Sequence, residues 1–233
     1  MQGCVKEQEY EAKEEVLIRV YFKENASLEN VTDFKKWGNI WYEIGRGIAM
    51  VHNAAPENVR IVGATSGSIV IEMAAVASIA STTSIIILSA LKVAERVIDI
   101  LKKVEELRNL KLNNEKLLNG LEKEAQKKKE TGINKIADEI IRKLGLNSEG
   151  EGDKINALKK SVTNLVNFIE SGGEVDFIIP EQDLEESEEA EGTEKLTEGH
   201  IDYTKIKETA RQIRELEHKM KALEGPADHN EDD

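Results

Sequence analysis

The sequence is poor in cysteine, proline and aromatic residues. It has one cysteine, Cys4, so we expect neither an intramolecular disulfide nor a cysteine metal cluster, which suits a cytoplasmic protein. Three prolines and 4% aromatic residues, beside 33% charged residues, are typical of helix-dominated chains and argue against an all-β fold. The first residues lack the apolar stretch of a secretory leader, so we expect a cytoplasmic start.

Motifs of catalysis, metal binding and cofactor binding are also missing. The four histidines are far apart in the sequence and there is no Walker A motif. Residues 63–67 have the glycine spacing of a nucleophile elbow, but Thr65 stands where serine should be, so a hairpin turn is the better interpretation. Gly45 and Gly47 lack the third glycine of a dinucleotide site, and we interpret them as small residues that let a helix approach a sheet.

We therefore expect no enzyme activity, no cofactor and no metal. An enzyme remains a third hypothesis, because active sites also form from residues that are distant in the sequence. Its indicator would be a pocket that holds Glu72 or His52 with a perturbed pKa.

Negative charge is concentrated in two segments. The net charge is -13, of which residues 181–198 supply -8 (nine acids, one lysine) and residues 226–233 supply -4. The rest is close to neutral, and the only local basic run, Lys127 to Lys129, has no interleaved aromatic residues, so we expect no nucleic-acid partner. We predict a disordered acidic linker over 180–199 and a solvated tail over 226–233.

The N-terminal part has the pattern of a small α+β module. Residues 16–23 alternate apolar and polar side chains, which indicates a half-buried strand. An apolar stripe predicts a helix over 33–53, capped by Asn30 or Thr32, with Trp37 and Trp41 packed on the sheet. Residues 58–62 and 68–73 are typical of a hairpin.

A run without any charge, residues 73–91, is the most unusual feature of the sequence. It continues into an amphipathic pattern with apolar positions as far as Leu121. The simplest interpretation is one helix of more than 35 residues, either straight or broken near Asn113 and Asn114. We favour a buried core helix for the uncharged run. A self-association face and a membrane span are the alternatives, since nineteen residues are about the length that crosses a bilayer.

Three further helices and one short strand follow. Apolar stripes predict helices over 133–144 and 155–169, residues 175–179 are compatible with a short strand, and a last heptad-like stripe predicts a helix over 203–223. The expected fold is helix-dominated α+β, with a three-stranded sheet (β-α-β-β) packed on a long helix. The expected divisions are the module (1–112), a helical extension (113–179), the linker, a tethered C-terminal helix (200–225) and the tail.

These features favour a non-enzymatic interaction or self-assembly protein, of the adaptor or inhibitor type. An amphipathic helix at the end of an acidic linker suits docking on its own chain, on a second copy or on another protein. We expect a protein partner of unknown identity and a homo-oligomer. A membrane anchor that uses residues 73–91 is the alternative. The predicted partner-binding residues are Ile206, Ile213, Leu216, Met220 and Leu223 on the last helix, with Val97, Leu101 and Val104 on the long one.

Overall fold

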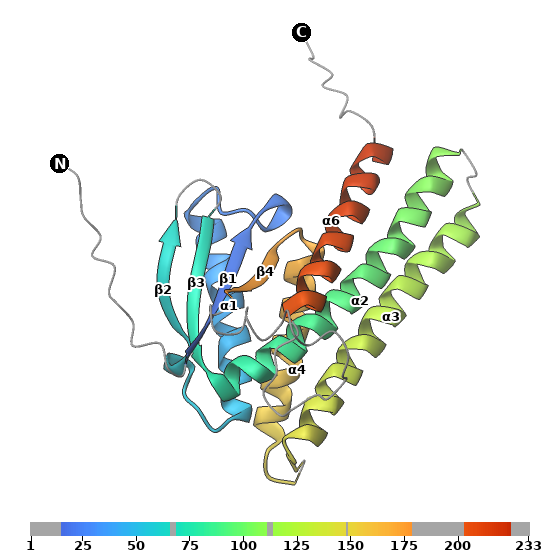
Figure 1. Ribbon diagram of the computed structural model, residues 1–233. Helices are drawn as coiled ribbons and strands as arrows, with labels where there is room; N and C mark the ends of the chain where they lie inside the picture. Colours follow the sequence, from blue (N-terminus) through green and yellow to red (C-terminus); the bar gives the residue numbers. More distant parts are fainter. Residues whose placement is uncertain (1–14, 66–68, 111–113, 148, 179–202, 225–233) are drawn as a thin grey trace, which may run out of the picture.

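The computed structural model describes residues 15–65, 69–110, 114–147, 149–178 and 203–224. Within these ranges it is a helix-dominated α+β fold with five helices and a four-stranded antiparallel sheet. Two of the helices, α1 and α4, lie behind the sheet, while α2 extends away from it between α3 and α6 (Figure 1). The helix-dominated α+β class is therefore confirmed.

The sheet has one strand more than expected. Its strands are β1 (Glu15–Phe22), β2 (Arg60–Thr65), β3 (Ile69–Val76) and β4 (Glu174–Ile178), in the order β2-β3-β1-β4. The prediction of three strands was wrong because β4, five residues long, joins the edge of β1 from far along the sequence. There Val175 pairs with Val20 and Phe177 with Ile18, so the apolar face of the sheet continues across both strands.

Helix α1 (Val31–Val51) begins and ends close to the predicted positions. The Asn30 side chain accepts hydrogen bonds from the backbone N–H groups of Thr32 and Asp33, at 2.9 and 3.1 Å, so Asn30 is the N-cap. Past the last turn, Asn53 adopts a positive φ of 56°, which turns the chain away from the helix axis. Trp37 is only 3% exposed, which confirms that it packs in the core.

The predicted long helix is two helices. Helix α2 (Ala77–Asn109) ends after 33 residues, and α3 (Glu115–Lys143) returns along it. The Asn114 side chain accepts a hydrogen bond from the Leu117 N–H at 3.2 Å and caps α3. The apolar positions continue across this break at Leu110 and Leu117, although these side chains are 68% and 47% exposed, so periodicity alone did not reveal the turn.

The uncharged run contributes to the core. Its first residues complete β3 and the rest form the first half of α2, where Ile79, Ile86 and Ile87 are at most 1% exposed. The preferred interpretation, a buried core helix, is confirmed for these side chains. Among the described residues, every helix is too short or too polar to cross a membrane.

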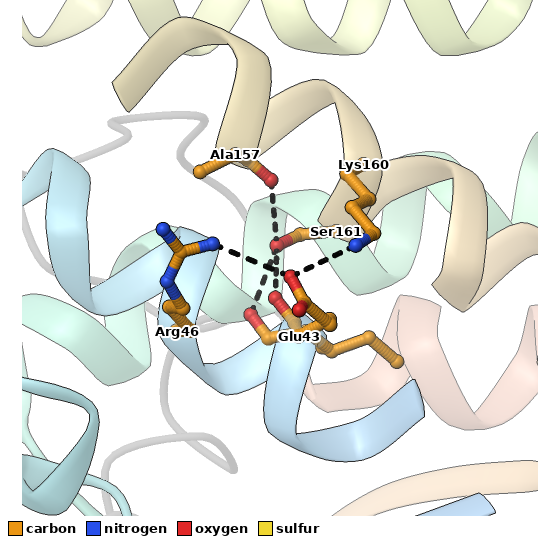
Figure 2. A network of polar contacts seen from close by, with 6 residues as sticks. Glu43, Arg46, Ala157, Lys160 and Ser161 are labelled. Atoms are coloured by element: carbon orange, nitrogen blue, oxygen red, sulfur yellow. Dashed lines mark hydrogen bonds and ion pairs between the residues drawn. The ribbon is translucent and has the colours of Figure 1, made fainter. Parts of the chain in front are cut away.

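Helix α4 (Gly152–Glu170) crosses α1 at very close range. The Ser161 hydroxyl lies within 2.9 to 3.1 Å of the carbonyl oxygens of Glu43, Ile44 and Ala157 (Figure 2). A Cβ on Gly47 would lie 2.0 Å from the Ser161 Oγ and 2.4 Å from the Ala157 carbonyl oxygen. Gly47 thus permits contact with a helix, not with the sheet as predicted.

One aromatic ring joins the two helices to the sheet. Phe168 on α4 is fully buried and meets Phe22, Trp37 and Trp41 edge-on, with centroid distances of 5.5, 5.3 and 5.1 Å. Edge-to-face pairs add about 0.5–1.5 kcal/mol beyond the burial of their area. Residues from both the predicted module and the predicted extension therefore share one core.

Helix α6 (Tyr203–Glu224) is the predicted C-terminal helix, and it lies along α2. The predicted acidic linker (180–199) and acidic tail (226–233) lie outside the described residues. Nothing tests the predicted division into domains, which stays a prediction.

Replacing Gly47 by alanine should destabilise the fold, because the added methyl group overlaps Ser161 and the Ala157 backbone. We expect Gly47→Ala to lower the free energy of unfolding by about 1–3 kcal/mol, measured by urea denaturation. Gly120→Ala on α3 is the matched control, since its Cβ would meet nothing within 4 Å. The control should raise the free energy of unfolding by about 0.5–1 kcal/mol, and equal effects of the two variants would contradict the packing described.

Candidate functional site

The predicted interaction helix, α6, is seated on its own chain. Ile206 and Ile213 are 1% and 4% exposed, and Thr209 between them is 7% exposed. Leu216 and Met220 pack half-buried against the same core, and Leu223 is also half-buried. The five α6 residues predicted to bind a partner therefore form one stripe that faces the body of the protein, with its deepest contacts in the first half of the helix.

The three predicted residues of α2 are buried or half-buried within the chain, and two of them lie on the side of α3. On α3, a Cβ at Gly132 would come within 2.5 Å of the Val93 side chain, so Val93 faces that helix. Val97 and Val104 follow it by four and eleven residues, which places them on nearly the same face at 3.6 residues per turn. They are 4% and 1% exposed, while Leu101 is half-buried. In this conformation Val97 and Val104 are covered before any partner arrives.

Polar contacts hold the C-terminal end and the middle of α6. Near its C-terminus, the Asn109 side chain of α2 donates a hydrogen bond to the Leu223 carbonyl at 2.7 Å, which satisfies an acceptor that the helix leaves free. Lys221 pairs with Glu24, in the short 3-10 helix η1 (Glu24–Ala26). In the middle of α6, Arg214 Nη1 lies 3.1 Å from Glu174 Oε2 on β4.

A polar groove runs beside the apolar stripe, between α2 and α6. It is lined by Glu95, Arg96 and Asp99 from α2 and by Gln212, Glu215, Leu216 and Lys219 from α6. All of these except Leu216 are charged or polar, so water can enter between the two helices. Contact between α6 and α2 is therefore part apolar and part solvated, as in interfaces that open and close.

One carboxylate of α6, near Glu174 of β4 and Glu24 of η1, has an unusual proton affinity. The pKa of Glu217 is raised from its ordinary value to about 7, first by burial and then by the neighbouring carboxylates of Glu174 and Glu24. Lys221 and Arg214 oppose this shift without cancelling it. Seated α6 therefore binds a proton on Glu217 near neutral pH, which a solvated Glu217 would release.

Sequence periodicity identified the apolar stripe of α6 but not its polar partners. Glu24, Asn109 and Glu174 come from three elements that are far apart in the chain, and each looks like an ordinary surface residue in its own segment. Glu217 adjoins Leu216 on the helix, so its place at the border of the stripe was visible, but the carboxylates that face it were not.

The residues suggested for an enzyme have structural partners. His52 Nε2 lies 2.8 Å from the Thr82 hydroxyl, and burial lowers the pKa of His52. Glu72 accepts a hydrogen bond from Arg19 at 2.8 Å, on the sheet face opposite the core. Within the described part of the chain, no three His, Cys, Asp or Glu side chains are grouped so that they could hold a metal ion.

Docking of α6 should weaken as pH rises from 6 to 8. The raised pKa of Glu217 means that the seated helix favours its protonated form, so stability present at low pH is lost as pH rises toward and past about 7. Hydrogen exchange of the α6 amides, corrected for intrinsic rates, should become faster over this range relative to that of α4. Glu217→Gln should remove most of the pH dependence, whereas Glu215→Gln, an exposed neighbour, should keep it; an unchanged profile in Glu217→Gln would contradict the assignment.

Comparisons with known proteins supply no family for this chain. No family model, no curated protein and no solved structure matches it. Its function must therefore be inferred from its own residues.

Proposed function

We propose that the protein is a non-enzymatic interaction and self-assembly module whose exchangeable element is α6. In a single copy, α6 occupies its own α2; in the assembled state it occupies the α2 of a second copy, or gives way to the helix of another protein. The observation that supports this function best is the seat of α6: an amphipathic helix held by one apolar stripe beside a solvated groove.

The sequence distance between β4 and α6 favours exchange. Residues 179–202 connect the two elements, and a segment of this length reaches up to roughly 80 Å when extended. Exchange of an identical element between copies needs no new interface, because the contacts made in the dimer are the contacts already present in the monomer. Tethering gives the helix a high effective concentration at its own α2, so exchange requires a high protein concentration.

Burial favours this function over a membrane anchor. The side chains that an anchor in residues 73–91 would have to expose, among them Ile79, Ile86 and Ile87, are in the core. The net charge of -13 also favours a protein partner over nucleic acid. We further propose a cytoplasmic location, supported by the single cysteine.

Exchange of α6 between copies is measurable by energy transfer in a Cys4→Ser background. One batch carries a donor dye at Lys92→Cys on α2 and the other an acceptor at Lys207→Cys on α6, both at exposed positions. After concentrated batches are mixed and incubated, we expect energy transfer between copies and a mass of twice 26.0 kDa by light scattering. A mass of 26.0 kDa at every concentration, without transfer, would refute self-assembly.

A charge in the stripe should prevent this exchange. Ile213→Asp in the acceptor batch places a carboxylate at a position that is 4% exposed and should weaken docking by about 2–3 kcal/mol, abolishing transfer. Ala222→Asp adds the same charge to the exposed side of α6 and should leave transfer intact. Transfer that persists in the Ile213→Asp variant would show that the dyes report on another contact, and loss of transfer in both variants would contradict the role of the stripe.

A further inference from the structure

An apolar cavity of about 230 Å³ lies between α1 and the β2 side of the sheet, separate from the contact of α6. Five residues of the sheet line it, Val20, Phe22, Ile61, Ile71 and Met73, and Trp37 and Trp41 line it from α1. No residue of α4 lines it, so the cavity occupies the half of the α1–sheet contact that α4 does not fill. It exceeds the roughly 150 Å³ engineered cavities that bind benzene.

Two glycines of α1 keep this space open. Gly38 and Gly45 are seven residues apart, so they lie on one face of the helix, and both line the cavity. A Cβ at Gly38 would meet nothing within 4 Å, and one at Gly45 would meet only Val59, at 3.9 Å. Unlike Gly47, neither is required by packing, although a glycine inside a helix costs about 0.5–1 kcal/mol relative to alanine. The sequence thus forgoes helix stability at the two positions where a side chain would reduce the cavity.

The entrance of the cavity combines exposed apolar side chains with a cation. Phe34, Tyr42 and Ile61 are 63%, 57% and 69% exposed and belong to its lining. Arg46 is the one charged residue of the lining. A ligand that places an apolar body against the tryptophans can therefore bring its polar end to Arg46.

Arg46 can turn to a ligand without leaving a carboxylate unpaired. Its Nη1 lies 3.4 Å from Glu43 Oε2, and the same oxygen lies 3.3 Å from Lys160 Nζ on α4 (Figure 2). One carboxylate thus serves two cations. If Arg46 moves to an anion, Lys160 remains with Glu43, so the entrance carries a surplus positive charge.

We propose that this cavity is a binding site for a medium-chain carboxylate: its aliphatic chain lies against Trp37, Trp41 and the inner face of the sheet, and its carboxylate pairs with Arg46. The ligand is an unesterified carboxylate, because the entrance offers one cation for one anionic group. Binding requires no covalent step.

The chain contains its own reporter for this site. Its only two tryptophans, Trp37 and Trp41, both line the cavity, so occupancy changes the intrinsic fluorescence. Titration of the full-length protein with decanoate, below the concentration at which it forms micelles, should give a saturable change. Decanol, with the same chain and no charge, should bind more weakly, and phosphatidylcholine vesicles should give no change. Absence of a saturable response to decanoate, or an equal response to vesicles, would overturn the proposal.

Two variants test separately the binding of the ligand's aliphatic chain and the binding of its carboxylate. Gly45→Leu places a side chain in the cavity and should abolish the response, while its unfolding temperature shows that the protein is folded. Arg46→Gln should weaken decanoate binding about five- to ten-fold, as expected for loss of a partly solvated charge-assisted hydrogen bond, and leave decanol binding unchanged. Binding that persists in a folded Gly45→Leu protein would place the ligand elsewhere, and equal weakening of both ligands by Arg46→Gln would refute the role of Arg46.

Discussion

The close crossing of α1 and α4 is the contact on which the rest of the structure depends. Gly47 allows the helix backbones to approach, and Ser161 donates its one proton among the carbonyl oxygens that meet there. This contact positions α4 along α1, and so places Phe168 in the aromatic cluster with Phe22, Trp37 and Trp41. Phe168 lies two residues before the end of α4, so the turn that leads to β4 begins beside this cluster.

The turn after α4 directs the chain into the fourth strand. Gly172 adopts a φ of +85°, a conformation that side chains other than glycine rarely tolerate, and a Cβ on Gly173 would lie 2.3 Å from the Phe168 ring. With both glycines, β4 leaves the helix directly into the edge of β1. The same placement puts Glu174 beside α6, so one short strand serves the sheet and the helix contact together.

The sequence predicted elements better than it predicted their neighbours. Local signals, such as the Asn30 cap and the apolar stripes of α1, α4 and α6, act within a few residues, and these elements form where they were expected. The pairing of β4 with β1 depends on a contact between distant segments, which a periodic pattern does not encode. The start of α3 is marked locally by the Asn114 cap, but not by the apolar periodicity. The cavity could not be predicted either. Gly38 and Gly45 are visible in the sequence, but the open space beside them depends on how distant segments pack.

The pairing of β1 with β4 has a consequence for how the chain is made. Val20 meets Val175, so the sheet is completed only after nearly the whole described chain has left the ribosome. Until then the hairpin of β2 and β3 can pair with β1, but the other edge of β1 and the faces of Trp37 and Phe22 that receive Phe168 stay uncovered. Such long-range closure slows folding and leaves a strand edge exposed during synthesis. The nascent protein is therefore most vulnerable to aggregation just before residue 178 emerges.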